Sequence, residues 1–288
     1  MRDLGFINSK TQLCAVIGNP LGHTLSPAIH NAAFDALGLD FVYLAFQVAT
    51  QEQAVAAMRG LDAFRGLSVT IPHKIAILGL VDEVAAIDRH IGAINTVVKE
   101  NGRLAGLGTD GPGALKAFCD AGVDLRGRRV LLLGAGGAAR AIAFTLAQQG
   151  VAGLTVLDID AALLKRLTDD LRQGTDANVA ADSLDEKTLA KQVPAADVLI
   201  HCTPIGMHPK VDRSLVPPEL LQPRQVVFDI VYNPLKTRLL RDAEARGLQT
   251  IPGVEMFVNQ AVLQFERFTG QDAPVEVMRR VVLEHLGR

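Results

Sequence analysis

Four short apolar segments between residues 129 and 230 constrain the fold of the chain more than any other feature. They read RVLLL at 129–133, LTVLD at 154–158, DVLIH at 197–201 and VVFDI at 226–230, and helix-like stretches separate them. Strands that are apolar on both faces are typical of a parallel sheet covered by helices on both sides. This half of the chain is therefore predicted to be a doubly wound α/β domain.

A similar alternation of strands and helices is expected in the first third of the chain. Strands are predicted there at 13–17, 41–48 and 67–70, and helices over 27–37 and after Thr50. At the other end of the chain, two further helices are predicted after residue 253. Ser26 before Pro27 is expected to cap the first helix and Gly38 to end it, while Thr50 and Gln53 form a capping-box pattern. The polar stretch RQGTDANVAADSLDEK is predicted to be a surface excursion.

The length and charge of the chain indicate a two-domain protein that binds a small molecule. With 288 residues, 49% of them hydrophobic, the chain is near the length at which one core divides into two. Its formal charge of -2 and its lack of long like-charge runs argue against nucleic acid or a membrane as partner.

The three cysteines and the N-terminus point to a soluble protein of the cytoplasm. Cys14, Cys119 and Cys202 are widely spaced in apolar surroundings, which predicts buried free thiols rather than disulfides or a metal site. The opening residues, MRDLGFINSK, lack a signal-peptide pattern, and no apolar run is long enough to cross a membrane.

The segment VLLLGAGGAARAIAF carries a candidate cofactor site. Gly134, Gly136 and Ala139 follow an apolar strand and open an Ala-rich helix, which is the context of a dinucleotide-binding turn. Gly134 allows the tight turn, Gly136 lets the backbone approach a pyrophosphate, and Ala139 permits close packing of helix on strand. The alternative is an ordinary strand-to-helix turn without a ligand.

Asp158 ends the next strand and bears on the choice of cofactor. A carboxylate there accepts hydrogen bonds from the ribose hydroxyls and repels a 2′-phosphate. No arginine lies in LDIDAA, the nearest being Arg166, so NAD is expected rather than NADP. Asp160 is interpreted mainly as the cap of the following helix, a role that Asp158 could also fill.

The turn HCTPIGM at 201–207 is expected to border the same ligand, because it follows the carboxyl end of a strand. Thr203 and Met207 are candidates for lining the nicotinamide half of the site. The alternative is an ordinary strand exit.

Six segments spread over the whole chain resemble the motifs of the shikimate/quinate dehydrogenase family. They are VIGNPLGHTLSPAIHNAAF, LSVTIPHK, GAINTV, GTDGPG, GAGGAAR and GVEMFVNQAVLQFERFTG, in the family's order. The resemblance implies two α/β domains with the active cleft between them. Residues 1–109 with 253–288 would form the substrate domain and residues 110–252 the Rossmann nucleotide domain, in a monomer or homodimer.

By motif match, the catalytic pair is Lys74 in IPHK and Asp110 in GTDG. Oxidation of an alcohol carbon requires a group within hydrogen-bond reach that takes the hydroxyl proton, and the reverse reaction needs an acid there. Without the resemblance, Lys74 would be interpreted as a surface lysine in the first turn of a helix, and GLGTDGPG as a turn. His73 is interpreted as structural.

The resemblance also implies contacts with substrate and cofactor. Thr24 and Ser26 match the hydroxyl pair that binds the substrate carboxylate, although Ser26 also fits a helix cap. The other substrate residues are Thr70, Asn95 and Gln260, and the cofactor residues are Gly134, Gly136, Gly137, Ala138, Ala139, Asp158, Thr203, Met207, Val231, Gly253 and Met256.

This chain departs from the family at two positions. Gly108 replaces the asparagine of Asn-Thr-Asp-Gly, whose amide is expected to bind a ring hydroxyl, and Ser68 stands where asparagine is common. Losing that contact is expected to cost about 1–3 kcal/mol, or to leave space for another substituent or a water.

The predicted function is NAD(P)-dependent dehydrogenation of shikimate, quinate or a close analogue, a polyhydroxy cyclic carboxylate. The alternatives are a dehydrogenase of a different cyclic carboxylate, such as an amino-shikimate, and a metabolite sensor without turnover. The presence of both Lys74 and Asp110 argues against the sensor, because binding alone does not require a proton-transfer pair.

Overall fold

The computed structural model describes residues 7–22 and 24–287, and the chain separates into two compact units. The first unit comprises the residues up to Thr109 with those from Gln260 onward, and the second runs from Asp110 to Asn259. The later division lies inside helix α9 (Gly253–Thr269), beyond the expected residue 253. Residues 1–6, on which the interpretation of the N-terminus partly rests, lie outside the described residues.

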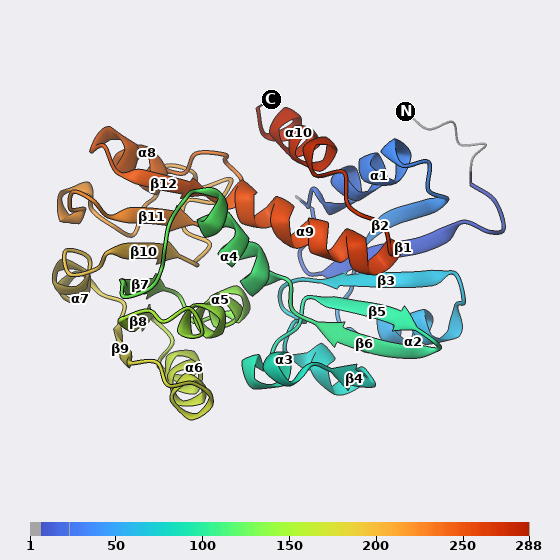
Figure 1. Ribbon diagram of the computed structural model, residues 1–288, viewed down its shortest axis with the longest axis horizontal. Helices are drawn as coiled ribbons and strands as arrows, with labels where there is room; N and C mark the ends of the chain where they lie inside the picture. The colour runs from blue at the N-terminus through green and yellow to red at the C-terminus, as the bar shows by residue number, and fades with distance from the viewer. Residues whose placement is uncertain (1–6, 23, 288) are drawn as a thin grey trace. The chain divides into compact units, whose positions relative to one another are not determined.

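The first unit contains a mixed sheet, sheet A, with the strand order β2-β1-β3-β5-β6-β4 (Figure 1). Its strands are β1 (Gln12–Gly18), β2 (Phe41–Gln47), β3 (Phe64–Val69), β4 (Glu83–Val84), β5 (Thr96–Glu100) and β6 (Arg103–Leu107). Strands β1, β2 and β3 are parallel, whereas β5 is antiparallel to β3 and to β6. The helices are α1 (Ser26–Ala36), α2 (Glu52–Gly60), η2 (Ala76–Leu80), α3 (Ala86–Ile91), α10 (Val275–Leu286) and the later part of α9.

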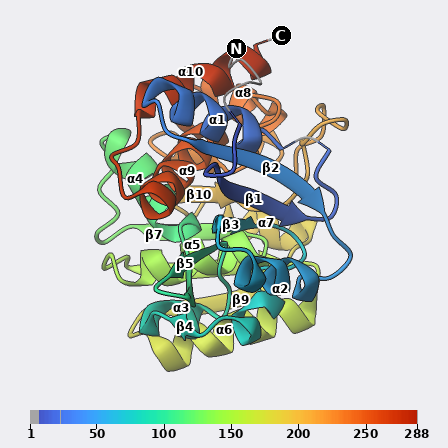
Figure 2. The ribbon, with the colours of Figure 1, turned by 90° about the vertical axis from the view of Figure 1, so that its right-hand side faces the viewer.

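Both faces of sheet A are covered by helices. Leu67 of β3 packs in one core cluster with Met58 of α2. Its neighbour Gly66 points to the opposite face, where a Cβ would lie 2.1 Å from the ring of Phe268 in α9. On that face Phe34 of α1 lies 5.3 Å from Phe265 of α9, and α1 runs beside α10 (Figure 2).

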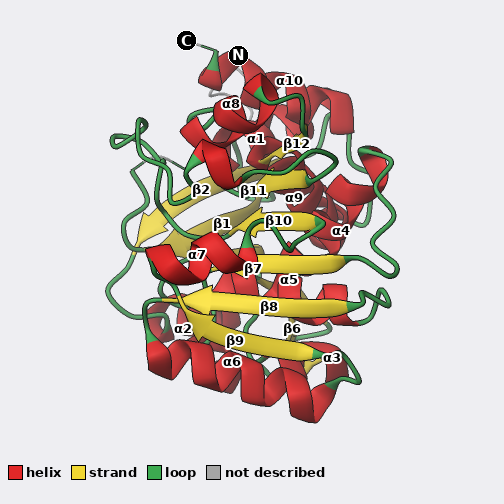
Figure 3. Ribbon diagram, turned by 90° about the vertical axis from the view of Figure 1, so that its left-hand side faces the viewer, coloured by secondary structure: helices red, strands yellow, loops and turns green. Residues whose placement is uncertain are grey.

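The second unit is built on a parallel sheet, sheet B, with the order β12-β11-β10-β7-β8-β9 (Figure 3). Its strands are β7 (Arg129–Leu133), β8 (Gly153–Asp158), β9 (Val179–Ser183), β10 (Val198–His201), β11 (Val226–Asp229) and β12 (Gln249–Pro252). The helices are α4 (Asp110–Asp120), α5 (Gly137–Ala147), α6 (Ala161–Gly174), α7 (Glu186–Gln192), η3 (Pro218–Leu220), α8 (Arg238–Ala245) and the start of α9.

The strand order of sheet B confirms the predicted doubly wound fold. The chain begins at β7 in the middle, moves outward to β9, and returns to β10 on the other side of β7. Ligands of such folds bind where the strand order reverses, beyond the carboxyl ends of the two central strands. In sheet B these are the ends of β7 and β10.

Several local predictions are wrong. Helix α1 begins at Ser26 itself rather than after it, and among the described residues no side chain caps α1 or α2. The stretch interpreted as a surface excursion does lie at the surface, but it contains β9 and the start of α7. Cys119 is exposed rather than buried. Other predictions are confirmed: Gly38 follows α1 with a φ of +64°, and Asp160 caps α6 by accepting from the backbone N–H groups of Ala162 and Leu163.

The GLGTDGPG segment is mostly helix rather than turn. Strand β6 ends at Leu107 and α4 begins at Asp110, so that Gly111 and Gly113 lie within the helix. A Cβ on Gly111 would lie 2.1 Å from Thr145 Oγ1 of α5 and 2.9 Å from the Ala141 carbonyl oxygen. Glycine at position 111 therefore lets α4 lie directly against α5.

Every helix of residues 7–22 and 24–287 is too short or too polar to cross a bilayer.

Candidate active site

Lys74 lies in the turn that follows β3, ahead of the 3-10 helix η2, and not in the first turn of an α-helix. Its carbonyl oxygen accepts a hydrogen bond from Ile94 N at 2.9 Å, and Val69 N donates to the carbonyl oxygen of Asn95 at 2.7 Å. These bonds tie the lysine turn to the segment that carries Asn95. Thr70 enters the same turn and is anchored by its N–H, which donates to the Ile17 carbonyl at 2.9 Å.

His73, next to the lysine, is buried inside the first unit. Its Nδ1 lies 3.1 Å from Gln51 Oε1 and its Nε2 lies 3.2 Å from the Val48 carbonyl oxygen. Both ring nitrogens thus face acceptor oxygens of the protein, in keeping with a structural role.

Asn95, Thr109 and Gln260 form one hydrogen-bonded cluster in the first unit. Asn95 Oδ1 accepts from Thr109 N at 2.8 Å, and Asn95 Nδ2 donates to Thr109 Oγ1 at 2.9 Å and to Gln260 Oε1 at 3.3 Å. Asn95 and Thr109 are almost fully buried. Thr109 was not singled out in the sequence, yet its bonds to Asn95 fix the backbone one residue before Asp110.

A second polar chain in the first unit was also missed in the sequence. The Tyr43 hydroxyl donates to Ser68 Oγ at 2.7 Å, and Ser68 Oγ donates to Gln264 Oε1 at 2.8 Å. Gln264 Nε2 in turn donates to Thr96 Oγ1 at 2.9 Å and to the Asn95 carbonyl at 3.2 Å. Burial raises the pKa of Tyr43, so that the phenol stays protonated and acts as a donor.

Thr24 and Ser26 lie together at the start of α1. The Thr24 hydroxyl donates to Ser26 Oγ at 3.2 Å, and Ser26 N donates to Thr24 Oγ1 at 3.3 Å. Ser26 also lies close enough to Tyr43 to lower the pKa of its hydroxyl slightly against the larger effect of burial, so the hydroxyl pair lies beside the chain through Ser68. Helix α1 thus starts beside two adjacent hydroxyls, an arrangement that suits a carboxylate.

The space around Gly108 differs from the sequence-based expectation. A Cβ at this position would lie 2.7 Å from Asp88 Oδ1 and 4.0 Å from the Ala93 carbonyl oxygen, so the direction of a side chain at position 108 is occupied by the Asp88 carboxylate. Asp88 is 6% exposed; burial raises its pKa, and a hydrogen bond from the Gly108 N–H opposes that shift. A side chain at position 108 would have to displace the Asp88 carboxylate, and the hypothesis that Gly108 makes room for a different substrate stays a prediction.

The glycine turn after β7 fits the pyrophosphate of a dinucleotide. Gly134 has a φ of +108°, and a Cβ there would lie 2.9 Å from the Cys202 carbonyl oxygen, so the turn requires glycine. Around Gly136, which precedes α5, a Cβ would meet no described atom within 4 Å. Gly137, Ala138 and Ala139 form the first turn of α5, whose free N–H groups and dipole favour an anion in that open space.

Asp158 lies beside this turn. Its Oδ2 accepts from Ala135 N at 2.5 Å and its Oδ1 from Asp160 N at 2.8 Å, which holds the carboxylate at the end of β8. Arg140 of α5 is buried and forms an ion pair with Asp170, with its guanidinium carbon 5.5 Å from the centre of the Phe144 ring.

The remaining cofactor candidates lie on the other side of β7. Thr203 Cγ2 would be 3.3 Å from a Cβ on Gly134, so Thr203 borders the glycine turn. A Cβ on Gly253 would lie 2.5 Å from the Ile230 carbonyl oxygen, which brings the start of α9 against Val231. Met256 follows one turn later in α9 and is buried, while Met207 is half-exposed.

Asp110, the first residue of α4, is 7% exposed. Its negative charge and that of Asp229 add to burial in raising the pKa of the Cys202 thiol, so within the second unit Asp110 lies near the end of β10. Among residues 7–22 and 24–287, no three His, Cys, Asp or Glu side chains are grouped so that they could hold a metal ion.

Comparison with known proteins identifies the family. Residues 16–97 match the shikimate dehydrogenase substrate binding domain, and residues 253–283 match the shikimate 5′-dehydrogenase C-terminal domain. A shikimate dehydrogenase (NADP+) of Methanopyrus kandleri is 43% identical over 97% of this chain and 98% of its own length.

Two solved structures are also closely similar. A shikimate dehydrogenase in complex with NADP+ has a TM-score of 0.91 at 34% identity, with 98% of each chain covered. A shikimate 5-dehydrogenase of Listeria monocytogenes, in complex with shikimate and NAD, has a TM-score of 0.89 at 35% identity, covering 98% of this chain and 99% of its own. The chain described here therefore belongs to the shikimate dehydrogenase family of oxidoreductases.

Proposed function

We propose that this protein catalyses reversible oxidation of a ring hydroxyl of shikimate or a closely related cyclic carboxylate, with NAD as the preferred cofactor. The observation that carries the proposal is the Gly134–Gly136 turn, with open space over Gly136 at the first turn of α5. When bound, the nicotinamide ring supplies the hydride acceptor.

The residues of this chain supply binding and proton transfer. Lys74 takes the hydroxyl proton during oxidation and returns it during reduction, and Asp110 favours and orients the ammonium group. Thr24 and Ser26 bind the carboxylate through their hydroxyls. Asn95 and Gln260 bind the ring hydroxyls, because amide groups can both donate and accept.

The preference for NAD rests on Asp158. Its carboxylate lies next to the Ala135 N–H of the glycine turn, where a ribose hydroxyl would find an acceptor and a 2′-phosphate a like charge. Arg140, the basic residue of the GAAR segment, is paired with Asp170. The Methanopyrus relative named above is an NADP+ enzyme, whereas the Listeria structure holds NAD. The preference for NAD is therefore proposed for the present chain in particular.

The test is a comparison of kcat/KM for shikimate oxidation with NAD and with NADP. We expect NAD to be favoured about tenfold or more, and Asp158→Asn to lower the NAD-to-NADP ratio because it keeps an acceptor for Ala135 N but removes the charge. Asp160→Asn, which changes the cap of α6, is the matched control and should leave the ratio unchanged. A tenfold preference for NADP in the natural protein would overturn the cofactor claim.

A close analogue of shikimate is the second candidate substrate. The observation that favours it is Ser68, whose hydroxyl is already bonded to Tyr43 and Gln264 where relatives commonly carry an asparagine. Shikimate, quinate and an amino-substituted shikimate should be compared under the same conditions. Preferred turnover of an analogue would replace shikimate in the proposal, and lack of turnover with all three would contradict it.

A further inference from the structure

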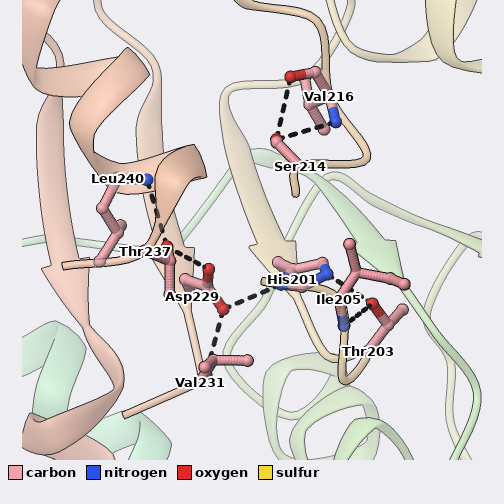
Figure 4. Close-up of polar contacts among 9 residues, drawn as sticks. All are labelled: His201, Thr203, Ile205, Ser214, Val216, Asp229, Val231, Thr237 and Leu240. Atoms are coloured by element: carbon pink, nitrogen blue, oxygen red, sulfur yellow. Dashed lines mark hydrogen bonds and ion pairs between the residues drawn. The ribbon is translucent and has the colours of Figure 1, made fainter. Parts of the chain in front are cut away.

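The carboxyl ends of β10 and β11 carry a buried histidine and a buried aspartate side by side. His201 and Asp229 are register partners in sheet B and are 2% and 0% exposed. His201 Nδ1 lies 2.8 Å from Asp229 Oδ1 (Figure 4). Neither residue was singled out in the sequence, and neither has a role in the function proposed above.

The surroundings of Asp229 determine which ring nitrogen of His201 carries the proton. Asp229 Oδ1 also accepts from Val231 N at 3.0 Å. Asp229 Oδ2 accepts from the Thr237 hydroxyl at 2.6 Å, and Thr237 Oγ1 in turn accepts from Leu240 N at 3.3 Å. Both carboxylate oxygens are thus acceptors, so Nδ1 of His201 is the donor and a neutral ring keeps its lone pair on Nε2.

In the neutral ring, the lone pair on Nε2 fixes the direction of the Thr203 hydroxyl. Nε2 lies 2.5 Å from Thr203 Oγ1, so the threonine donates its only hydroxyl proton to the ring. Ile205 N donates to the same oxygen at 3.3 Å. Toward any further group, Thr203 Oγ1 can therefore act only as an acceptor.

Thr203 stands beside the glycine turn, since its methyl group would be 3.3 Å from a Cβ on Gly134. A pyrophosphate offers only acceptor oxygens, so an accepting hydroxyl does not match it. The nicotinamide half of a dinucleotide offers donors, namely the ribose hydroxyls and the carboxamide NH₂.

We propose that His201 and Asp229 are positioning residues that hold the Thr203 hydroxyl as an acceptor for a hydrogen-bond donor on the nicotinamide riboside half of the cofactor. This inference rests on the proposed function, because it requires that the second unit bind a nicotinamide dinucleotide. In this proposal the Asp229 carboxylate and the His201 imidazole only orient the Thr203 hydroxyl, and no covalent step is involved.

The first test is a double-mutant cycle on cofactor affinity, measured as the equilibrium Kd for NAD. Thr203→Val removes the hydroxyl at nearly constant shape and should raise the Kd up to about tenfold, the effect of one neutral hydrogen bond. His201→Gln should raise it by a similar factor. The double variant should bind no more weakly than Thr203→Val alone, because the histidine acts through that hydroxyl.

Controls separate positioning from a general loss of structure. Thr203→Ser keeps the hydroxyl and should retain most of the affinity. Thr168→Val removes a buried hydroxyl that bonds only to carbonyl oxygens of α6, and it should leave the Kd unchanged. Factors that multiply in the double variant, or an unchanged Kd for Thr203→Val, would overturn the inference.

The second test needs no variant and no cofactor. In ¹⁵N-histidine NMR spectra of the free protein, His201 should appear with a protonated Nδ1 and an unprotonated Nε2; the opposite tautomer would refute the inference even if His201→Gln failed to fold. Failure of the proposed function is distinguishable, because it would appear in the natural protein as a preference for NADP or as a lack of turnover, and neither result depends on the tautomer of His201.

The analogue 3-acetylpyridine adenine dinucleotide distinguishes the two donors, because it lacks the carboxamide NH₂. If Thr203→Val weakens NAD but not this analogue, the donor is the carboxamide. If it weakens both equally, the donor is a ribose hydroxyl.

Discussion

The candidate residues of the two units are held in place by different kinds of contact. In the second unit, partners lie at the ends of neighbouring strands of one parallel sheet, as with Ala135 and Asp158 or His201 and Asp229. In the first unit, Asn95 and Ser68 each have one partner in α9, 165 and 196 residues further along the chain. A parallel sheet gathers its strand ends by topology alone, whereas the first cluster exists only when distant segments have packed.

The largest expected effect tests whether Lys74, which belongs to the first unit, serves the chemistry without contributing to cofactor binding. Lys74→Ala should lower kcat by about 10²–10⁴-fold, because a proton-transfer group is lost. The Kd for NAD should stay unchanged, since all the cofactor candidates belong to the second unit. Steady-state kinetics and equilibrium binding check the two parts.

Lys116→Ala is the matched control for Lys74→Ala. Lys116 forms a surface ion pair with Asp120, so its removal should alter neither quantity. A weakened NAD affinity in Lys74→Ala would show that Lys74 also contributes to cofactor binding.

Two buried histidines, one in each unit, differ in their hydrogen bonds, and this difference predicts an effect of pH on stability. His201 has two hydrogen-bond partners, whereas the ring nitrogens of His30 have none among the described residues. His30 lies 4.4 Å from the Tyr43 ring, and burial lowers its pKa from 6.5 to about 3. Between pH 3 and 6.5, His30 binds a proton in the unfolded chain but not in the folded protein. The stability that depends on neutral His30 is therefore complete above pH 6.5 and is lost as the pH falls toward 3.

His30→Phe should remove this acid loss. The natural protein should lose on the order of 1 kcal/mol of unfolding free energy per pH unit more than the variant in that window. Urea titrations of both proteins at several pH values measure the difference. Parallel pH profiles would show that His30 does not titrate as its burial implies.

An intermediate effect is expected at Gly108. Gly108→Asn forces a side chain onto Asp88 Oδ1 and should cost about 1–3 kcal/mol of stability. Asp88→Ala combined with Gly108→Asn should recover most of that loss, because the carboxylate that blocks the space is gone. Denaturation measures both, and the ranking of substrates should not change; an altered ranking in the folded double variant would mean that position 108 contacts the substrate after all.

The smallest effect is expected for Tyr43→Phe. This change removes the hydroxyl that donates to Ser68 Oγ and should cost about 1 kcal/mol of stability. If the long-range network positions the substrate residues, the KM for shikimate should rise a few-fold while the Kd for NAD stays constant. An unchanged KM would confine the role of this network to stability.

The sequence predicted the second unit better than the first for physical reasons. The apolar runs of β7, β8, β10 and β11 and the glycine turn are local signals, and the structure places them nearly at the expected residues. Strand β9 was missed because its residues after Val179 are small or polar and exposed, and its pairing with β8 provides what its composition lacks. The β5–β6 hairpin was overlooked although its turn, Asn101–Gly102, carries a recognisable signal, with φ values of 50° and 77°.

The candidate site was predictable only in part. Resemblance to a family named Asn95 and Gln260, but nothing local to either residue indicates that they meet. Thr109, Gln264 and Asp88 were missed because their importance lies in the partners they acquire on folding. The closeness of Gly108 to Asp88 was not foreseen, because a sequence does not reveal which way an absent side chain would point.

The closeness of Gly111 to Thr145 limits how these two positions can change in evolution. Position 111 accepts a side chain only if position 145 of α5 gives up its own, and the Ala141 carbonyl behind it limits even that exchange. Descendants of this chain should therefore change these two positions together or not at all. Sequences that carry alanine at position 111 should show a smaller residue at 145, and this covariation would be a record of how closely α4 lies on α5.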